Sequence, residues 1–195
     1  MEIGASLAQL EIIATDPQAS AAFYASTFGL APCANEGTIA CTAPSREIVL
    51  VPGEGGQLHR ASFRFAEPSK FAAHRALLVS RGVPLVEDGP DAFTVRDPEG
   101  RLIRFLAPTD APHTVHGLAT LEARLQHFGV RSPAPAALAD FYVGTLGFVL
   151  SDRVLDEHGD LTAAFLRTDA EHHSMAIFRA PAIRFDHFSC ETAGW

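Results

Sequence analysis

Apolar and polar residues alternate in short runs along most of the chain, a pattern typical of half-buried β-strands. Between some of these runs lie longer segments with the apolar spacing of an amphipathic helix. We expect strands around Leu10 and Ile12, over 47–51, 58–65, 83–86, 93–95 and 102–106, around Phe128 and Val130, and over 163–168, 174–178 and 184–191.

The same order of elements occurs twice, 118 residues apart. Phe23-Tyr24 is repeated as Phe141-Tyr142, and Thr27-Phe28-Gly29 is matched by Thr145-Leu146-Gly147. In both copies a strand comes first, a helix follows, and short strands come after the helix. The repeat predicts two copies of one structural unit.

Both copies carry signals for the start and the end of the helix. Pro17 and Pro133 suit the first helical position, where the N–H that proline lacks would be unpaired. Gly29 and Gly147 follow the helices where a left-handed cap is wanted, a conformation that glycine adopts without strain. These signals support a strand–helix–strands reading of each copy.

Further units of the same kind complete the chain. One opens at 58–65 and has its helix over 69–81, and another opens at 184–191. The order β-α-β-β-β therefore recurs, which predicts an α+β protein whose βαβββ modules form curled, barrel-like mixed sheets with helices outside. We expect a two-module N-terminal domain at 1–107, a connection rich in Pro, Thr and His at 108–124, and a second domain, one module plus the start of the next, at 125–195.

Composition narrows the possible partners. A net charge of −8 argues against nucleic acid or an anionic membrane as partner, since both attract basic surfaces. The chain has no run of 18 apolar residues, and its N-terminus lacks the cationic flank of a signal peptide. Three cysteines without a CxxC motif favour a reducing compartment. We therefore expect a cytoplasmic protein without a membrane span, which forms a homo-oligomer.

Histidines at the starts of expected strands are the candidate chemistry. His127, His187 and His172 each fall on the small, polar face of their strand, whereas His173 would point toward the helix layer. A single strand histidine is most often a structural residue with a satisfied hydrogen bond. Three on polar faces indicate the wall of a site instead.

The motifs around these histidines resemble a known family. FY-x-x-TLGF at 141–148, HHS at 172–174 and DHF at 186–188 together resemble the catalytic domain of the type I extradiol ring-cleavage dioxygenases. That family belongs to the vicinal oxygen chelate superfamily of glyoxalases, bleomycin resistance proteins and dioxygenases, which is built from paired βαβββ modules. The resemblance extends over essentially the whole chain and is strongest at 125–191.

The resemblance implies roles for the histidines. It implies that His127 and His187 bind a metal and that the acid–base histidine lies in the HHS motif. The family spacing selects His172, which strand alternation also favours over the neighbouring candidate, His173. The implied cofactor is Fe²⁺, with Mn²⁺ as a possible replacement, and the implied reaction is extradiol (meta) cleavage of a catechol by dioxygen, the co-substrate. Arg131, Ser174 and Glu191 are candidates for lining the pocket, although ordinary polar strand residues explain them as well.

The N-terminal domain departs from the metal-binding pattern. Gln9 stands where the second domain has His127, Arg60 stands where it has His187, and Arg104 occupies the place of a carboxylate. We expect this domain to bind no metal. Its expected role is structural, or as part of a dimer contact or of the substrate-side wall.

The third metal ligand implied by the resemblance is a carboxylate on the last strand of the fourth module. Arg104 follows Arg60 by 44 residues, and the same spacing after His187 falls beyond Trp195. Glu191 is on the expected site face and Asp186 on the opposite face, and neither is expected to be the ligand. We therefore expect the site to be incomplete within this sequence and the chain alone to be a poor dioxygenase.

Two other functions share the module. One is a metal-dependent isomerase or lyase of the glyoxalase type, and the other is a non-catalytic small-molecule-binding protein like the bleomycin resistance proteins. The HHS motif and the degenerate N-terminal domain favour the dioxygenase. The incomplete fourth module gives some weight to the binding protein.

Overall fold

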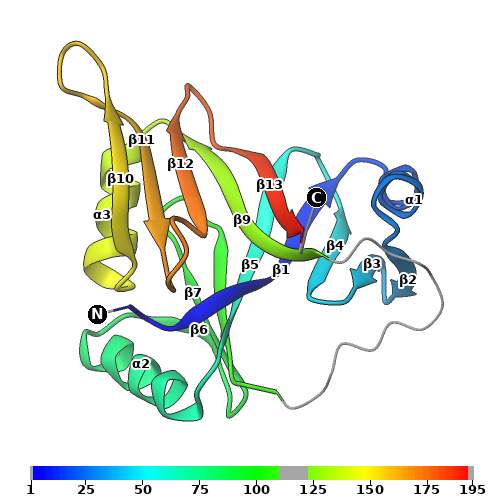
Figure 1. The fold of residues 1–195 in the computed structure, drawn as a ribbon, viewed down its shortest axis with the longest axis horizontal. Coiled ribbons are helices and arrows are strands. Elements are labelled where there is room, and N and C mark those ends of the chain that lie inside the picture. Colours follow the sequence, from blue (N-terminus) through cyan, green and yellow to red (C-terminus); the bar gives the residue numbers. More distant parts are fainter. Residues whose placement is uncertain (1, 110–122, 193–195) are drawn as a thin grey trace.

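The computed structural model describes residues 2–109 and 123–192 and contains three βαβββ modules and the first strand of a fourth (Figure 1). The expected connection at 108–124 lies mostly outside the described residues. Within the described part of the chain, no helix is long and apolar enough to cross a membrane. The elements are β1 (Ala5–Ala14), α1 (Pro17–Phe28), β2 (Ala31–Asn35), β3 (Thr38–Ala43), β4 (Arg46–Pro52), β5 (Gln57–Phe65), α2 (Pro68–Ser80), β6 (Leu85–Asp88), β7 (Ala92–Arg96), β8 (Leu102–Leu106), β9 (Ala123–Ser132), α3 (Pro135–Asp140), the π-helix η1 (Phe141–Thr145), β10 (Val149–Leu155), β11 (Leu161–Arg167), β12 (Met175–Arg179) and β13 (Arg184–Thr192).

The strands form two mixed sheets, in agreement with the predicted α+β fold. The first has the order β2-β3-β4-β1-β5-β8-β7-β6, and the second has the order β10-β11-β12-β9-β13. In each complete module the first strand runs parallel to the last. The first strands of successive modules pair antiparallel, as β1 with β5 and β9 with β13. Both sheets of the described residues have two free edges, so they are open and do not close into barrels.

The antiparallel pairs β1–β5 and β9–β13 have the same register. β1 and β9 occupy positions 118 residues apart, in agreement with the sequence repeat. Gln9 lies opposite Ser62 as His127 lies opposite Ser189, and both pairs contain two register shifts, at corresponding places. The two halves of the chain therefore share details of backbone geometry as well as topology.

The helix signals are confirmed in the first module, and in the third module Gly147 has the expected left-handed conformation, with φ of 80°, whereas the start of the helix differs. α1 begins at Pro17, its cap Asp16 accepts the N–H of Ala19 at 2.9 Å, and Gly29 ends it with φ of 64°. The third module's helix begins at Pro135, so Pro133 is not at the first helical position. Pro133 lies instead in a turn before the helix, in which the Ser132 hydroxyl accepts the N–H of Ala134 at 3.0 Å.

A single apolar core continues from the first sheet into the third module. Phe63 on β5 contacts Phe148 and Phe128, with ring centroids 5.4 Å and 6.3 Å apart. The helices lie on the outer sides, with α3 against β11 and β12 and α2 on the side of the first sheet (Figure 1). The third module is therefore fixed firmly against the N-terminal half.

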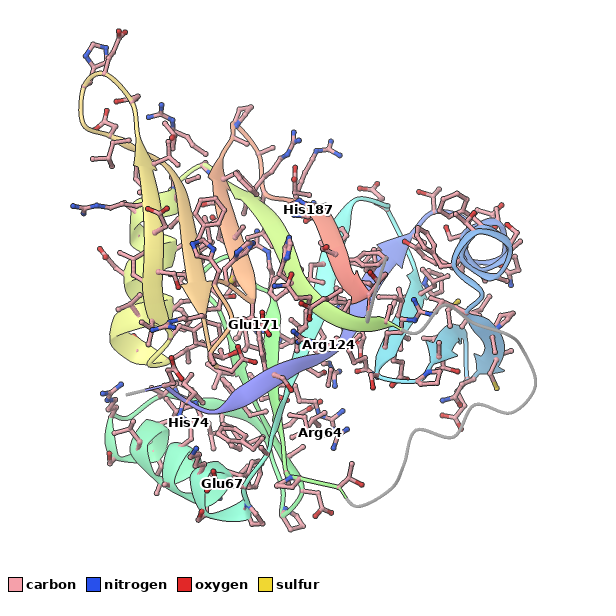
Figure 2. All side chains as sticks on the ribbon, in the orientation of Figure 1. Arg64, Glu67, His74, Arg124, Glu171 and His187 are labelled. Carbon is pink, nitrogen blue, oxygen red and sulfur yellow. The ribbon has the colours of Figure 1, made fainter. Side chains whose placement is uncertain are left out.

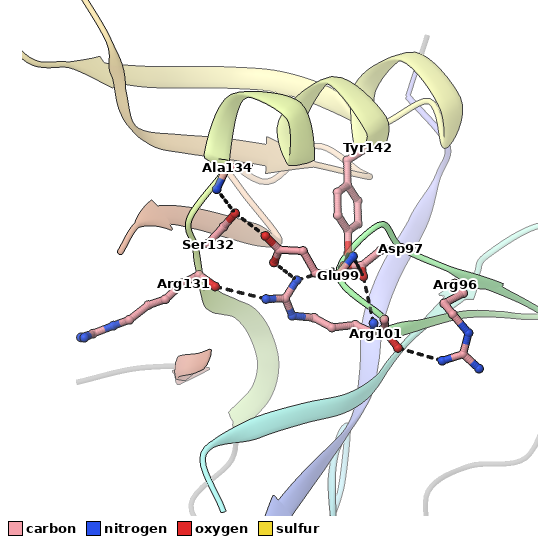
Figure 3. A network of polar contacts seen from close by, with 9 residues as sticks. Arg96, Asp97, Glu99, Arg101, Arg131, Ser132, Ala134 and Tyr142 are labelled. Atoms are coloured by element: carbon pink, nitrogen blue, oxygen red, sulfur yellow. Dashed lines mark hydrogen bonds and ion pairs between the residues drawn. The ribbon is translucent and has the colours of Figure 1, made fainter. Parts of the chain in front are cut away.

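A buried polar cluster reinforces this contact (Figure 3). It is centred on the turn between β7 and β8, where Asp97 and Arg101 are each 3% exposed. The Tyr142 hydroxyl donates to Asp97 Oδ2 at 3.0 Å, and Arg101 Nη1 donates to the same oxygen at 3.1 Å. Arg101 also donates to the backbone oxygen of Arg131 on β9 at 3.2 Å. The turn of the second module thus reaches into the third.

Candidate functional site

His127 and His187 face each other across neighbouring strands. β9 and β13 pair antiparallel, and both side chains project from the same face of the second sheet. Their Nε2 atoms are 3.1 Å apart, and their ring centroids are 5.2 Å apart. Figure 2 marks His187 on β13, close to β9 and β12. The predicted convergence of the two imidazoles is confirmed, and the binding of a metal by them stays a prediction.

The other nitrogen of each ring is hydrogen-bonded to the residue that precedes it in the chain. Asp186 Oδ2 lies 2.7 Å from His187 Nδ1, and Gln126 Oε1 makes a short contact with His127 Nδ1. A carboxylate oxygen and an amide oxygen only accept hydrogen bonds, so both Nδ1 atoms carry the proton. Both Nε2 atoms therefore present lone pairs to each other when the rings are neutral.

The electrostatics of the pair fit a metal ion. Burial, and then His173 and His187, lower the pKa of His127 to about 4, so this imidazole is neutral near pH 7. Two facing lone pairs repel each other unless a cation lies beside them. When two nitrogens each lie about 2.1 Å from one metal ion and the nitrogen–metal–nitrogen angle is near 90°, the nitrogens are about 3 Å apart. The pair therefore has the spacing of two adjacent ligands of one metal ion.

A third ligand is not found among the described residues. No group of three or more His, Cys, Asp and Glu side chains that could hold a metal occurs within residues 2–109 and 123–192. Asp186 faces His187, contrary to the expectation that it lies on the opposite face, because a register shift interrupts the alternation of β13 at this point. It contacts Nδ1 and not the Nε2 side. Neither Asp186 nor Glu191, which pairs with Arg124, completes the site.

His173, rather than His172, adjoins the histidine pair. The ring centroid of His173 is 4.3 Å from that of His127, and His172 is exposed. Both residues lie in a bend before β12, so the alternation argument that favoured His172 is wrong, since it assumed a strand. The two side chains remain connected, with their Nδ1 atoms 2.9 Å apart.

The surroundings of His173 keep it neutral. Burial lowers its pKa, and the neighbouring His172 and His187 lower it further. A neutral imidazole near pH 7 can accept a proton from a bound molecule. His173 is therefore a neutral imidazole that lies beside His127 and can accept a proton.

Gly129 leaves the space that the His187 ring occupies. Gly129 lies opposite His187 in the β9–β13 pair. A Cβ atom on Gly129 would lie 2.6 Å from Cε1 and 2.8 Å from Nδ1 of His187, closer than non-bonded atoms tolerate. The sequence analysis did not recognise this role. The available signal was a glycine inside a strand, two residues after a candidate ligand, which often marks a close approach.

Two phenylalanines line the same face of the sheet. Phe165 on β11 lies beside Ala176 on β12, and Phe178 lies two residues further along β12. The Phe165 ring is 5.1 Å from the His173 ring, and the Phe178 ring is 6.0 Å from the His187 ring. Both side chains are half-buried. They were missed because strand alternation alone does not tell a cavity wall from a core.

The expected lining residues have other partners. Ser174 is 1% exposed, and its hydroxyl oxygen lies 2.9 Å from that of Thr168, so it closes the bend rather than lining a pocket. Arg131 donates from Nε to Asp186. Glu191 pairs with Arg124, which also pairs with Glu171; Figure 2 marks Arg124 and Glu171. Of the three candidates, Arg131 contacts the histidine site, through Asp186.

The corresponding place in the first sheet is closed by ion pairs. Arg60 Nε lies 3.4 Å from Glu11 Oε1, and its Nη1 lies 3.6 Å from Glu87 Oε2. The Ser62 hydroxyl and Gln9 Oε1 are 3.2 Å apart. A guanidinium has no lone pair to give a metal ion. The prediction that this half binds no metal rests on these residues.

The comparisons with known proteins agree with the module pattern. The model of the Glyoxalase/Bleomycin resistance protein/Dioxygenase superfamily matches residues 124–188. A search of curated protein sequences gives no match. The sequence match therefore covers the segment that contains His127, His173 and His187.

Solved structures resemble the chain over nearly its whole length. The Mn(II)-bound glyoxalase from Novosphingobium aromaticivorans has a TM-score of 0.75 and 21% identity, covering 96% of this chain and 65% of that one. Homoprotocatechuate 2,3-dioxygenase from Brevibacterium fuscum, in complex with 3,4-dihydroxyphenylacetate, has a TM-score of 0.71 and 24% identity. The match covers 95% of this chain and 63% of the dioxygenase. BphC, a halotolerant catechol dioxygenase, has a TM-score of 0.75 and 16% identity. The match covers 97% of this chain and 70% of BphC.

The likeness to these structures concerns the fold. The chain spans less than two thirds of the length of the glyoxalase and of the homoprotocatechuate dioxygenase. The matches cover 95–97% of this chain, which contains the three modules and the additional strand β13 described above. This protein therefore has the vicinal oxygen chelate fold, and its residues 124–188 match the model of the glyoxalase, bleomycin resistance protein and dioxygenase superfamily.

Proposed function

We propose that this protein takes part in the extradiol cleavage of a catechol by dioxygen, at an iron(II) ion held by His127 and His187. The observation that carries the proposal is the approach of the two Nε2 atoms to 3.1 Å, with both Nδ1 protons directed away. Manganese(II) suits the same nitrogen ligands. The structural likeness to both a Mn(II)-bound glyoxalase and catechol-cleaving dioxygenases supports a metal-dependent enzyme.

The metal and the chain have separate tasks in this reaction. A bound iron(II) ion would bring the catechol oxygens and dioxygen together, which supplies proximity between two otherwise slow reactants. The ring bond next to the two hydroxyl groups breaks, and both atoms of dioxygen enter the product. The chain holds the ion, contacts the ring and moves protons.

His173 is the proposed acid–base residue. Its neutral imidazole, beside His127, can take a proton from a catechol hydroxyl and return it later in the reaction. The exposed His172, joined to it through the Nδ1 atoms, provides a route for that proton to solvent. The two histidines of the HHS motif thus have different tasks.

Phe165 and Phe178 are proposed to contact the aromatic ring of the substrate. They stand on the same sheet face as the histidines, and their rings are 6.2 Å apart at an interplanar angle of 87°. Aromatic side chains bind other rings through stacked or edge-to-face contacts. The face therefore combines an aromatic wall with ligands for a metal, as a catechol requires.

The test is oxygen uptake by purified protein loaded anaerobically with iron(II), with catechol, 2,3-dihydroxybiphenyl and 3,4-dihydroxyphenylacetate as substrates. We expect slow oxygen uptake, more than tenfold below the roughly 10 s⁻¹ of an ordinary enzyme, because no third ligand is found among the described residues, with a yellow ring-opened product formed in equal amount. His173→Gln should lower the rate by about 100-fold, the usual contribution of an acid–base residue. The matched variant His172→Gln should lower it by less than about tenfold, because solvent can replace a relay.

Three results would contradict the proposal. Conversion of an α-ketoaldehyde hemithioacetal without oxygen would support the glyoxalase-type isomerase instead. Catechol binding without oxygen uptake would support a binding protein. Equal losses in His172→Gln and His173→Gln would remove the acid–base assignment.

A further inference from the structure

We propose that Gln126 and Asp186 are positioning residues, each held by a β-bulge against the Nδ1 atom of the following histidine, so that both Nε2 atoms are presented to a metal ion. The inference rests on the proposed metal site and deepens it. It assigns to two residues outside the ligand set the task of fixing the tautomer of each ligand.

The bulges are visible in the pairing of β9 with β13. Gln126 lies between the pairs Leu125–Cys190 and His127–Ser189 and has no partner of its own. Asp186 is likewise extra between the pairs Phe185–Val130 and His187–Gly129. In a regular strand, neighbouring side chains point to opposite faces. A bulge interrupts the alternation, and here it brings each extra residue to the same side as the next histidine.

Each extra residue is itself held in place. Gln126 Nε2 donates to Glu171 Oε2 at 3.5 Å, which directs the amide oxygen toward His127. Arg131 Nε donates to Asp186 Oδ1, which leaves Oδ2 for His187. Each acceptor therefore has one orientation, and each imidazole has one tautomer.

The tautomer matters because the two histidines can otherwise bond to each other. If His187 carried its proton on Nε2, that proton could be donated to His127 Nε2, 3.1 Å away. The two nitrogens that should bind the ion would then satisfy each other, and the metal would have to break that hydrogen bond. Because Gln126 and Asp186 each accept an Nδ1 proton, neither Nε2 atom carries a proton, and the hydrogen bond between the two histidines does not form.

The N-terminal half provides an internal comparison. The β1–β5 pair has bulges at the corresponding positions, occupied by Ala8 and His59. The residues that follow them are Gln9 and Arg60, and Ala8 has no side-chain acceptor. The bulges thus belong to the scaffold shared by both halves. In the β9–β13 pair, the residues at the bulges are Gln126 and Asp186, and each accepts the Nδ1 proton of the histidine that follows it.

The two acceptors differ in charge. The Asp186 carboxylate makes its imidazole a stronger donor of electron density than the neutral Gln126 amide does. Removing Asp186 should therefore weaken metal binding more than removing Gln126. This order is a further consequence that can be measured.

The test combines metal affinity with a direct readout of the tautomer. Mn(II) is titrated into the 1–195 chain, and the free ion is followed by electron paramagnetic resonance. Asp186→Ala should weaken Mn(II) binding by about 10- to 100-fold, and Gln126→Leu by about tenfold, as for other partners of ligand histidines. Asp186→Asn should fall between the wild type and Asp186→Ala, because the carboxylate uses one oxygen for Arg131 and the other for His187, and an amide has a single oxygen. His59→Ala, at the bulge of the first sheet, is the matched control and should stay within about twofold.

The tautomer is read from long-range proton–nitrogen correlation spectra of the metal-free protein. The wild type should carry protons on Nδ1 of His127 and His187, and Asp186→Ala should show Nε2 protonation of His187. A change of general stability would not produce this signature. Unchanged tautomers and affinities in both variants would overturn the inference. A wild-type chain with the expected tautomers but no Mn(II) binding would overturn the proposed function and leave the tautomer assignment supported.

Discussion

The strand pairs β1–β5 and β9–β13 have the same backbone and carry different chemistry. Their registers correspond residue by residue, including both bulges. The first pair holds an arginine between two glutamates, and the second holds two facing imidazoles. The comparison shows that one backbone arrangement can hold either an ion-paired arginine or two facing imidazoles, and in the proposed function only the second arrangement accepts a metal ion.

The two strand pairs differ most clearly in the residue that lies opposite His187 in the second sheet and opposite Arg60 in the first. In the second sheet it is Gly129, which leaves room for the His187 ring. In the first sheet it is Glu11, whose carboxylate pairs with Arg60. The positive charge in the β1–β5 pair is therefore that of the Arg60 side chain, since an arginine is always charged.

The largest expected effect comes from removing one imidazole. His187→Ala should weaken Mn(II) binding by at least about 100-fold, since loss of even an indirect partner costs about 10- to 100-fold. Arg60→Ala, the corresponding change in the first sheet, should leave Mn(II) affinity within about twofold. Isothermal titration of both variants measures this. Equal losses would show that the two halves do not differ in metal binding.

A smaller effect should separate the two tyrosines of the repeated motif. Tyr142→Phe removes the hydrogen bond to the buried Asp97 carboxylate, which should lower the free energy of unfolding by about 2 kcal/mol. At Tyr24, no hydrogen bond of the hydroxyl is found within the described residues, and Tyr24→Phe should cost less than about 0.5 kcal/mol. Urea unfolding gives both values. Similar costs would mean that the cluster around Asp97 adds little stability.

The smallest expected effect sharpens the role of the glycine. In Gly129→Ala the new methyl group would displace the His187 ring from its place between Asp186 and His127, which should weaken Mn(II) binding by about tenfold. Gly144→Ala is the matched control, because no atom lies within 4 Å of a Cβ built there. Mn(II) titration compares the two. Unchanged affinity in Gly129→Ala would mean that the ring has other positions from which it binds.

Much of the fold could be predicted, because the modules repeat a strong pattern. The offset between Phe23 and Phe141 located the corresponding helices, and strand alternation placed His127 and His187 on one face. Edge strands were harder. β2 contains Pro32, and four of its five residues are exposed, so it shows no alternation.

The errors at the site share a physical cause. Alternation placed Asp186 on the wrong face and preferred His172, because it assumes a regular strand. Bulges and bends depend on pairing with a neighbouring strand, which local sequence does not encode. Gln126 and Asp186, which lie beside Nδ1 of His127 and His187, stand on the same irregularities, so local sequence does not reveal these contacts either.

The turn between β7 and β8 has a consequence for how the chain tolerates change. Hairpin turns rich in Asp, Pro and Gly usually lie in solvent and accept inserted residues. Here the side chains of Asp97 and Arg101 are buried beneath the helix of the next module and bind Tyr142 and the backbone of β9. One added residue would separate these partners and leave buried charges unpaired. This short hairpin is therefore a poor position for a tag, a loop graft or a new chain terminus.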